Sequence, residues 1–84
     1  MKRIATKIVV YTKNNCGDCK RAKFMFGACP IDIGLIEKNV DESEVFMDEL
    51  NILYSSYTLP TFVFEDGTVI RGFHEGKLMN ELGL

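Results

Sequence analysis

The sequence has no apolar run long enough to cross a membrane. Its longest uninterrupted apolar stretches are only a few residues, whereas a membrane-spanning helix needs roughly 20. Met1 to Arg3 resemble the basic start of a signal peptide, but Thr6 and Lys7 interrupt the apolar stretch that would have to follow. We therefore expect a protein of the cytoplasm with no membrane partner.

At 84 residues the chain also lacks the length for two folded domains. A chain of this size buries one modest core, covering roughly 60% of its unfolded surface. With 46% hydrophobic and 26% charged residues, its composition is that of a globular protein rather than a disordered or fibrous one. We expect residues 1–84 to form one domain that acts as a monomer.

The chain has three cysteines, an odd number. Three cysteines argue against a disulfide framework, and such frameworks are rare in a reducing compartment. Two of the three, Cys16 and Cys19, form a Cys-Gly-Asp-Cys motif shortly after an apolar run. A motif of this spacing can hold a metal, staple the chain or exchange electrons with another disulfide.

A structural zinc site needs four ligands, and the chain offers few beyond this motif. The remaining candidates are Cys29 and His74. Cys29 lies ten residues after Cys19, roughly 15 Å along a continuous helix, which is too far for one metal ion or for a disulfide between the two. We therefore expect no bound metal, a core position for Cys29 and a surface or helix-cap position for His74.

Charge of both signs is present, but it is unevenly distributed. Residues 24–68 carry nine acids against the single base Lys38, whereas residues 1–23 carry seven bases against the single acid Asp18. These runs can be ordinary solvated faces, or the basic run can steer an anionic partner toward Cys16, which it surrounds. Nucleic acid is not expected as a partner, because no platform of aromatic residues accompanies the bases.

The first half of the chain alternates between strand and helix patterns. Residues 4–11 are short and β-branched, which predicts a buried strand. From Gly17 to about Ala28 the apolar residues recur at spacings of three and four, which predicts a helix that ends before Pro30. Its predicted buried face consists of Cys19, Ala22, Met25, Phe26 and Cys29.

The second half continues this alternation and ends with a hairpin. Residues 33–40 suit a strand, and Asp41 stands three residues before Glu44, the arrangement of a helix N-cap. Residues 61–65 and 68–71 suit two antiparallel strands, joined at Asp66-Gly67 by a two-residue type I′ turn with positive φ at both positions. The predicted apolar stripes are Phe46, Leu50, Leu53 and Tyr54 in the second helix, and Leu78, Met79 and Leu82 in a last helix from about Glu75.

This order of elements, βαβαββα, predicts an α/β fold. The opening strand-helix-strand unit makes the first two strands parallel, whereas the hairpin makes the last two antiparallel. We therefore expect a mixed four-stranded sheet flanked by three helices.

The predicted position of Cys16, at the end of a strand-to-helix loop, favours electron exchange. Free backbone N–H groups and the helix dipole stabilise a thiolate there, and they lower a thiol pKa from about 8.5 to roughly 3.5–7.5. Cys16 is therefore the predicted nucleophile. Cys19, one turn later, can attack the mixed disulfide that Cys16 forms, which makes it the resolving thiol.

Two segments, VVYTKNNCGDCKRAKFM and YTLPTFVFEDGTVIRGF, resemble the glutaredoxins and the related redoxins that supply electrons to ribonucleotide reductase. The resemblance covers nearly the whole chain and implies a thioredoxin-like, glutaredoxin-type fold. It also implies that Cys16 attacks and Cys19 resolves. The implied substrate-binding residues are Tyr11, Lys13, Thr58, Leu59, Pro60, Gly72, Phe73 and Glu75, with Pro60 as a cis-proline.

Several positions depart from the pattern of many glutaredoxins. Gly17-Asp18 stands where they have Pro-Tyr, Arg71-Gly72 where they have Gly-Gly, and His74-Glu75 where they have the Asp-Asp that grips glutathione. The resemblance therefore leaves two electron sources open, namely glutathione as co-substrate, or thioredoxin reductase with NADPH.

The leading hypothesis is an enzyme, a glutaredoxin-like disulfide oxidoreductase without a bound cofactor. Its expected partners are disulfide-containing proteins or glutathione, with ribonucleotide reductase and thioredoxin reductase as specific candidates. Two alternatives remain. The small Gly17 beside Cys16 also resembles glutaredoxins that carry an iron-sulfur cluster with glutathione, and the fold can serve as a binding module without chemistry.

Overall fold

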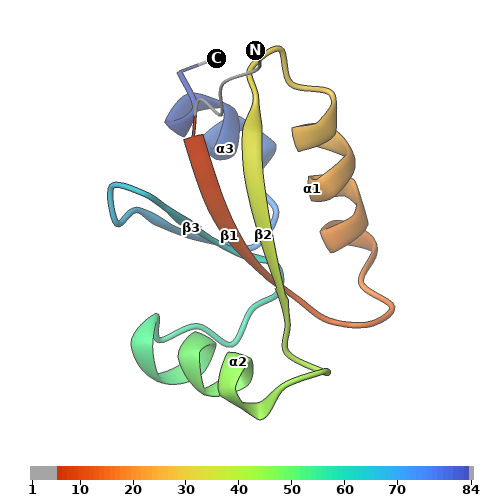
Figure 1. The fold of residues 1–84 in the computed structure, drawn as a ribbon, viewed down its shortest axis with the longest axis vertical. Coiled ribbons are helices and arrows are strands. Elements are labelled where there is room, and N and C mark those ends of the chain that lie inside the picture. Colours follow the sequence, from red (N-terminus) through yellow and green to blue (C-terminus); the bar gives the residue numbers. More distant parts are fainter. Residues whose placement is uncertain (1–5, 84) are drawn as a thin grey trace.

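The computed structural model describes residues 6–83 and contains one four-stranded sheet with the strand order β2-β1-β3-β4 (Figure 1). β1 is parallel to β2 and antiparallel to β3, and β3 is antiparallel to β4. The predicted mixed sheet is thus confirmed. The strands are β1 (Thr6–Thr12), β2 (Ile33–Asn39), β3 (Thr61–Phe64) and β4 (Val69–Arg71).

Helices cover both faces of this sheet, because successive side chains of a strand point to opposite sides. On one face, Ile8 and Val10 of β1 form a buried cluster with Phe26 of α1 (Gly17–Gly27) and Leu78 of α3 (Glu75–Glu81). On the other face, Tyr11 packs with Leu50 and other residues of α2 (Glu44–Asp48) and of the π-helix η1 (Glu49–Leu53). The sheet is therefore the middle layer of the fold. The helices α1 and α3 cover one face, and α2 and η1 cover the other.

Some sequence predictions fall outside the described part of the chain. They are the basic start at Met1 to Arg3 and the first residues of the predicted opening strand, Ile4 and Ala5. Within residues 6–83, no helix has both the length and the apolar character of a membrane span.

The helix α1 follows the predicted pattern closely. Cys19, Ala22 and Phe26 are buried, and Met25 and Cys29 are half-buried against the same cluster. The bases Lys20, Arg21 and Lys23 are exposed. Three-and-four spacing therefore identified the buried face of this helix correctly.

The predicted N-cap of the second helix is wrong. Ser43, not Asp41, precedes the first turn, and the Ser43 hydroxyl accepts the Phe46 N–H. Asp41 belongs to the loop after β2, where its N–H donates to the Asn39 side chain at 2.8 Å and its carboxylate accepts the Asn14 N–H at 2.9 Å. The loop uses Asp41 before the helix begins, so the serine two residues later becomes the cap.

The predicted apolar stripe of the second helix also fails at one position, because Leu53 is 68% exposed. The chain changes there from an α-helix to the π-helix η1, in which the Tyr54 N–H donates to the Glu49 carbonyl five residues earlier. A π-helix rotates less per residue than an α-helix, so three-and-four spacing no longer marks one face. Leu50 therefore stays buried while Leu53 turns to the surface.

The hairpin between β3 and β4 has a three-residue loop, not the predicted two-residue type I′ turn. Gly67 donates to the Phe64 carbonyl at 3.0 Å, and Phe64 donates to the Thr68 carbonyl at 2.9 Å. Within this loop only Gly67 has positive φ, and the Asp66 carboxylate accepts the Thr68 N–H at 2.9 Å. This is a turn followed by a bulged glycine, which needs one left-handed residue rather than two.

Candidate active site

Cys16 caps the N-terminus of α1, and Cys19 lies within bonding reach of it. The two sulfur atoms form a disulfide with a Cα–Cα distance of 5.2 Å. The Cys16 sulfur also accepts the Cys19 N–H at 3.2 Å, so it occupies the place of an N-cap oxygen. Cys16 is 7% exposed and Cys19 only 2%. An incoming sulfur therefore meets Cys16 before Cys19.

The loop between β1 and α1 is held by polar contacts that the sequence predictions missed. The Asn14 N–H donates to the Asp41 carboxylate, and the Asn39 amide donates to the Asn14 side-chain oxygen at 3.0 Å. Asn15 has a φ of 56°, a left-handed conformation that asparagine tolerates better than most residues. The Asn-Asn pair before the motif was the available signal for this turn, which places Cys16 at the helix start.

A second set of contacts ties α1 to the sheet beneath it. The Thr12 hydroxyl donates to Glu37 of β2 at 2.7 Å, and Lys23 of α1 lies 3.2 Å from the same carboxylate. The Thr12 hydrogen bond, followed by the contact with Lys23, lowers the pKa of Glu37 below its ordinary value. Through Glu37, these contacts link Thr12, the last residue of β1, to Lys23 of α1. Thr12 and Lys23 lie on either side of Cys16 in the sequence.

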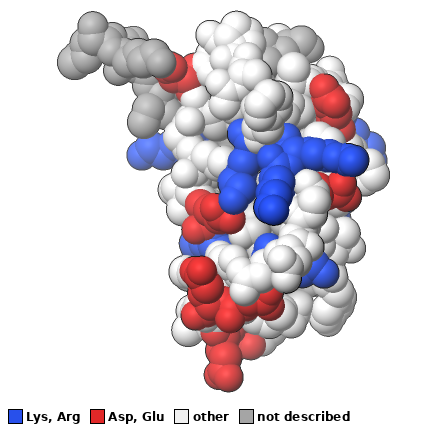
Figure 2. Space-filling model, turned by 90° about the vertical axis from the view of Figure 1, so that its right-hand side faces the viewer, with Lys and Arg blue, Asp and Glu red and all other residues white. Residues whose placement is uncertain are grey.

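The charges around Cys16 are of both signs. Asp18, in the first turn of α1, lies 3.6 Å from the Arg21 guanidinium, and both side chains are more than half exposed. Figure 2 shows the side of the molecule that carries α1, where Lys and Arg side chains gather near the centre and Asp and Glu side chains predominate below them. The basic run predicted from the sequence thus includes an exposed basic surface on the helix that follows Cys16.

The segment before β3 reaches the same end of the sheet as Cys16. Tyr11 pairs with Thr61 and Thr61 pairs with Arg71, so the residues after β1, before β3 and after β4 all lie at one end of the sheet. The Leu59–Pro60 peptide is cis, and the Gly72 N–H donates to the Pro60 carbonyl at 2.7 Å. Three loops therefore converge at the end of the sheet that carries Cys16.

Buried hydroxyl groups hold the segment around Pro60. The Thr61 hydroxyl donates to the Thr58 carbonyl at 2.6 Å and lies 2.8 Å from the Ser56 hydroxyl, which also accepts the Thr58 N–H. Ser56 and Thr61 are 1% and 0% exposed. No sequence signal pointed to this role, since serine and threonine are usually found on the surface.

The predicted substrate-binding residues do not all reach the surface. Thr58 and Lys13 are exposed, Leu59, Gly72 and Phe73 are half-buried, Glu75 is exposed and Pro60 is buried. Gly72 has a φ of +87°, and a Cβ there would lie 3.3 Å from the His74 ring, so a glycine suits this turn. The substrate roles of these residues stay predictions.

Tyr11 lies away from this surface. It is 1% exposed, and its hydroxyl donates to Glu49 of η1 at 2.7 Å. Burial, together with the contact to Glu49, raises the pKa of Tyr11 above its ordinary value. The structure thus places Tyr11 as a link between β1 and η1, and its predicted contact with substrate stays a prediction.

Replacing Glu49 by glutamine is expected to destabilise the protein by about 1–2 kcal/mol at pH 7, because Glu49 accepts hydrogen bonds from both Tyr11 and Lys38. The Lys38 hydrogen bond, then the Tyr11 one, lowers the pKa of Glu49. Because the pKa of Glu49 is lower in the folded state, its charge stabilises the protein above the pKa of the unfolded state, about 4.3. This stabilisation is lost as the pH falls through the pKa of the folded state. Urea unfolding should therefore show a difference between wild type and variant that shrinks toward pH 3.

Exposed Glu42 offers a matched control, and Glu42→Gln should change the stability little at either pH. A Glu49→Gln variant whose deficit stayed constant from pH 7 to pH 3 would show that the charge of Glu49 contributes nothing.

The residues that could bind a metal ion lie apart from one another in the described part of the chain. Cys29 is half-buried in the core cluster beyond the end of α1, and exposed His74 stands at the start of α3. Across residues 6–83, no three His, Cys, Asp or Glu side chains come close enough together to hold a metal ion.

Comparison with known proteins shows a consistent similarity. Residues 8–70 match the family model for glutaredoxin. The solved structure of the thioredoxin-like protein BC3987 is 32% identical, with 87% of this chain and 96% of that chain covered and a TM-score of 0.79. No curated protein sequence matches significantly.

Two solved glutaredoxins share the fold at lower identity. The glutaredoxin from Methanosarcina mazei Go1 is 22% identical with a TM-score of 0.75, and 93% of this chain and 79% of that chain are covered. The glutaredoxin from Archaeoglobus fulgidus is 23% identical with a TM-score of 0.68, and the coverage is 93% and 87%. The predicted thioredoxin-like fold is thereby confirmed.

Proposed function

The chain belongs to the glutaredoxin family and is a thiol–disulfide oxidoreductase, and we propose that Cys16 and Cys19 are the pair through which it reduces protein disulfides and glutathione mixed disulfides. One observation carries this proposal. The Cys16 sulfur caps α1 and accepts the Cys19 N–H, while the Cys19 sulfur lies close enough to bond with it.

The first step is the attack of Cys16 on the substrate disulfide. The helix N-terminus and the Cys19 N–H stabilise the Cys16 thiolate, which is the nucleophilic form of a thiol. A bond forms between the Cys16 sulfur and one substrate sulfur, the substrate disulfide breaks, and the other substrate sulfur leaves as a thiolate that takes up a proton.

The second step releases the substrate. Cys19 loses its proton and attacks the Cys16 sulfur, which breaks the mixed disulfide and frees the second substrate thiol. The substrate has gained two electrons and two protons, and the Cys16–Cys19 disulfide has formed. The low exposure of Cys19 supports this order, because an external disulfide has better access to Cys16.

The three loops at this end of the sheet form the proposed substrate site. An extended substrate chain can pair with the backbone at Leu59, next to the cis peptide of Pro60. Lys13 is exposed and free to meet a substrate carboxylate, and Glu75 can meet a substrate ammonium group. These two contacts match the two ends of glutathione, which supports glutathione as one substrate.

The proposal also covers the electron source, the protein substrate, the domain organisation and the location of the protein. The oxidised pair is reduced again either by glutathione or by thioredoxin reductase with NADPH, and ribonucleotide reductase is a candidate protein substrate. We further propose that residues 1–84 are a single domain, monomeric and cytoplasmic, that works without a bound cofactor.

NADPH consumption tests the proposed function. The protein is assayed with a disulfide substrate, once with glutathione plus glutathione reductase and once with thioredoxin reductase. We expect NADPH consumption that depends on the protein in at least one system, and the active system identifies the electron source. If neither system consumed NADPH above the rate without the protein, the proposed function would be wrong.

A further inference from the structure

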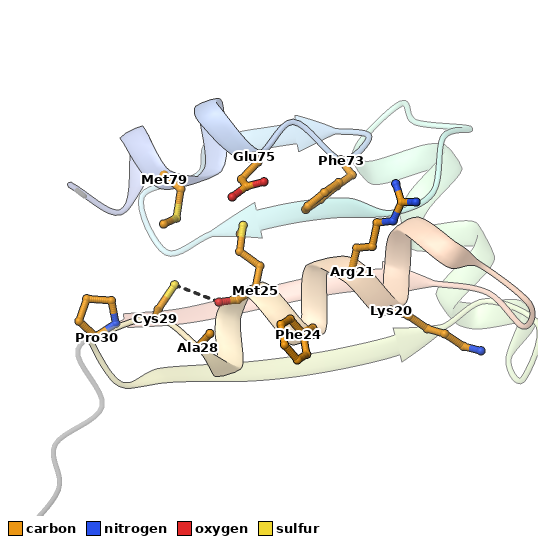
Figure 3. Close-up of a pocket in the computed structure, with 10 residues that line it drawn as sticks. All are labelled: Lys20, Arg21, Phe24, Met25, Ala28, Cys29, Pro30, Phe73, Glu75 and Met79. Carbon is orange, nitrogen blue, oxygen red and sulfur yellow. Dashed lines mark hydrogen bonds between the residues drawn. The ribbon is translucent and has the colours of Figure 1, made fainter.

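A groove of about 680 Å³ lies between α1 and the chain from Phe73 to Met79. Figure 3 shows Met25 of α1 and Glu75 of α3 pointing toward each other from its two sides, with Phe73 at one end. The groove has no role in the two chemical steps described above.

This groove begins beside the proposed substrate site, because two of its lining residues directly follow residues of that site in the chain. Phe73 follows Gly72, whose N–H donates to the Pro60 carbonyl. On the other side, Lys20 follows Cys19. A chain bound next to Pro60 therefore has the groove as its neighbour.

The lining of the groove suits apolar side chains. Phe24 on α1 is 80% exposed and lines the groove, so its ring is available to an apolar partner side chain. Met25 and Met79 add flexible, polarisable side chains that adapt to different partners. Glutathione has no large apolar side chain, so this part of the surface suits a polypeptide better than it suits glutathione.

The charges around the groove indicate that the bound polypeptide carries an acidic side chain as well as an apolar one. Lys20 and Arg21 lie on the α1 side and directly follow Cys19 in the chain, and Arg21 also lies 3.6 Å from Asp18. Glu75 lies on the opposite side of the groove. Glu75 repels an acidic group next to α3, so such a group is favoured only beside the two bases. A substrate with one acidic and one apolar side chain thus has complementary places for both.

We propose that this groove binds the polypeptide next to the substrate cysteine and selects protein disulfides flanked by an apolar and an acidic residue. The proposal rests on the proposed function and names its substrate class. The apolar side chain lies against Phe24 and Met25, and the acidic side chain lies against Lys20 and Arg21.

Matched peptide disulfides test this selectivity. One peptide carries leucine and glutamate next to the cysteine, a second has serine for the leucine, and a third has lysine for the glutamate. Wild type should reduce the first peptide with a kcat/KM at least about tenfold above that of the second, because burying one leucine side chain is worth that ratio or more. The difference should lie mainly in KM.

Two variants localise this preference to the groove. Phe24→Ser should bring the ratio between the first and second peptides close to one, and Lys20→Glu should reverse the preference between the first and third. Ile52→Ser replaces an apolar side chain of similar exposure, 74%, on η1 across the sheet, and it should keep both preferences. Circular dichroism confirms that each variant is folded.

The possible outcomes are distinct. Wild type that reduces all three peptides equally, or a Phe24→Ser variant that keeps the preference, overturns the groove proposal and leaves the proposed function intact. Wild type that reduces none of the peptides but is active in the NADPH assay also overturns only the groove proposal, whereas inactivity in both assays overturns the proposed function itself. Dimerisation in light scattering that Phe24→Ser abolishes would show that a second copy occupies the groove, and this also overturns the proposal.

Discussion

Cys16→Ser is expected to lower the disulfide reductase activity about a thousandfold or more, because a serine hydroxyl cannot form the mixed disulfide on which the reaction depends. The fold should tolerate the change, since serine is itself a good N-cap residue and can accept the Cys19 N–H in the same way. The comparison is made by NADPH consumption with the electron source that supports wild type.

Cys19→Ser provides the matched variant, because it removes the second sulfur and keeps the first. It should still attack protein disulfides but fail to release them, so a covalent complex through Cys16 should accumulate and be visible by mass spectrometry. With a glutathione mixed disulfide some activity should remain, since a second glutathione can do the work of Cys19. If Cys16→Ser formed the covalent complex and Cys19→Ser did not, the roles assigned to the two cysteines would have to be exchanged.

Phe62→Ala should destabilise the protein by about 3–5 kcal/mol, the typical cost of truncating a fully buried phenylalanine. Phe62 is 0% exposed, and its ring lies 5.6 Å from the ring of Phe26 in an edge-to-face arrangement. Because Phe26 belongs to α1, this contact holds the helix that carries Cys16 against the sheet. A domain of 84 residues has about 4–13 kcal/mol of total stability, so the loss is a large part of it.

Urea unfolding of the reduced protein measures this loss, and activity at rising temperature shows its functional consequence. Phe24→Ala is the matched control for the urea measurement, because this phenylalanine of α1 is 80% exposed. It should change the stability by no more than about 0.5 kcal/mol. Equal losses in the two variants would mean that the Phe26–Phe62 contact does not hold α1 in place.

The parts of the fold that were predicted correctly depend on local spacing. The β-branched residues of β1 and the three-and-four spacing of Cys19, Ala22 and Phe26 each require only neighbours within a few turns. The position of Cys16 before α1 follows from the point at which the strand pattern ends and the helical spacing begins. For this reason the element order and the location of the two cysteines could be predicted without a structure.

The predictions that failed depend on competition between local alternatives. Asp41 and Ser43 are both good N-cap residues, and contacts with Asn14 and Asn39 decided between them. Leu53 fits an α-helical stripe, but the hydrogen bonds of η1 changed the rotation per residue. Short-range patterns rank such alternatives poorly. The contact between Asn14 and Asp41 joins residues 27 positions apart, and in η1 two patterns of backbone hydrogen bonds compete for the same residues.

The sequence by itself determined the element order and the family resemblance, and it predicted which cysteines react, because these depend on spacing along one segment. Only the tertiary structure brought Cys16, Pro60 and Gly72 to one end of the sheet, buried Tyr11 against Glu49 and left the groove beside Phe24 open. The physical reason is that strand register and helix packing set the distances between segments. A pattern within one segment leaves those distances undetermined.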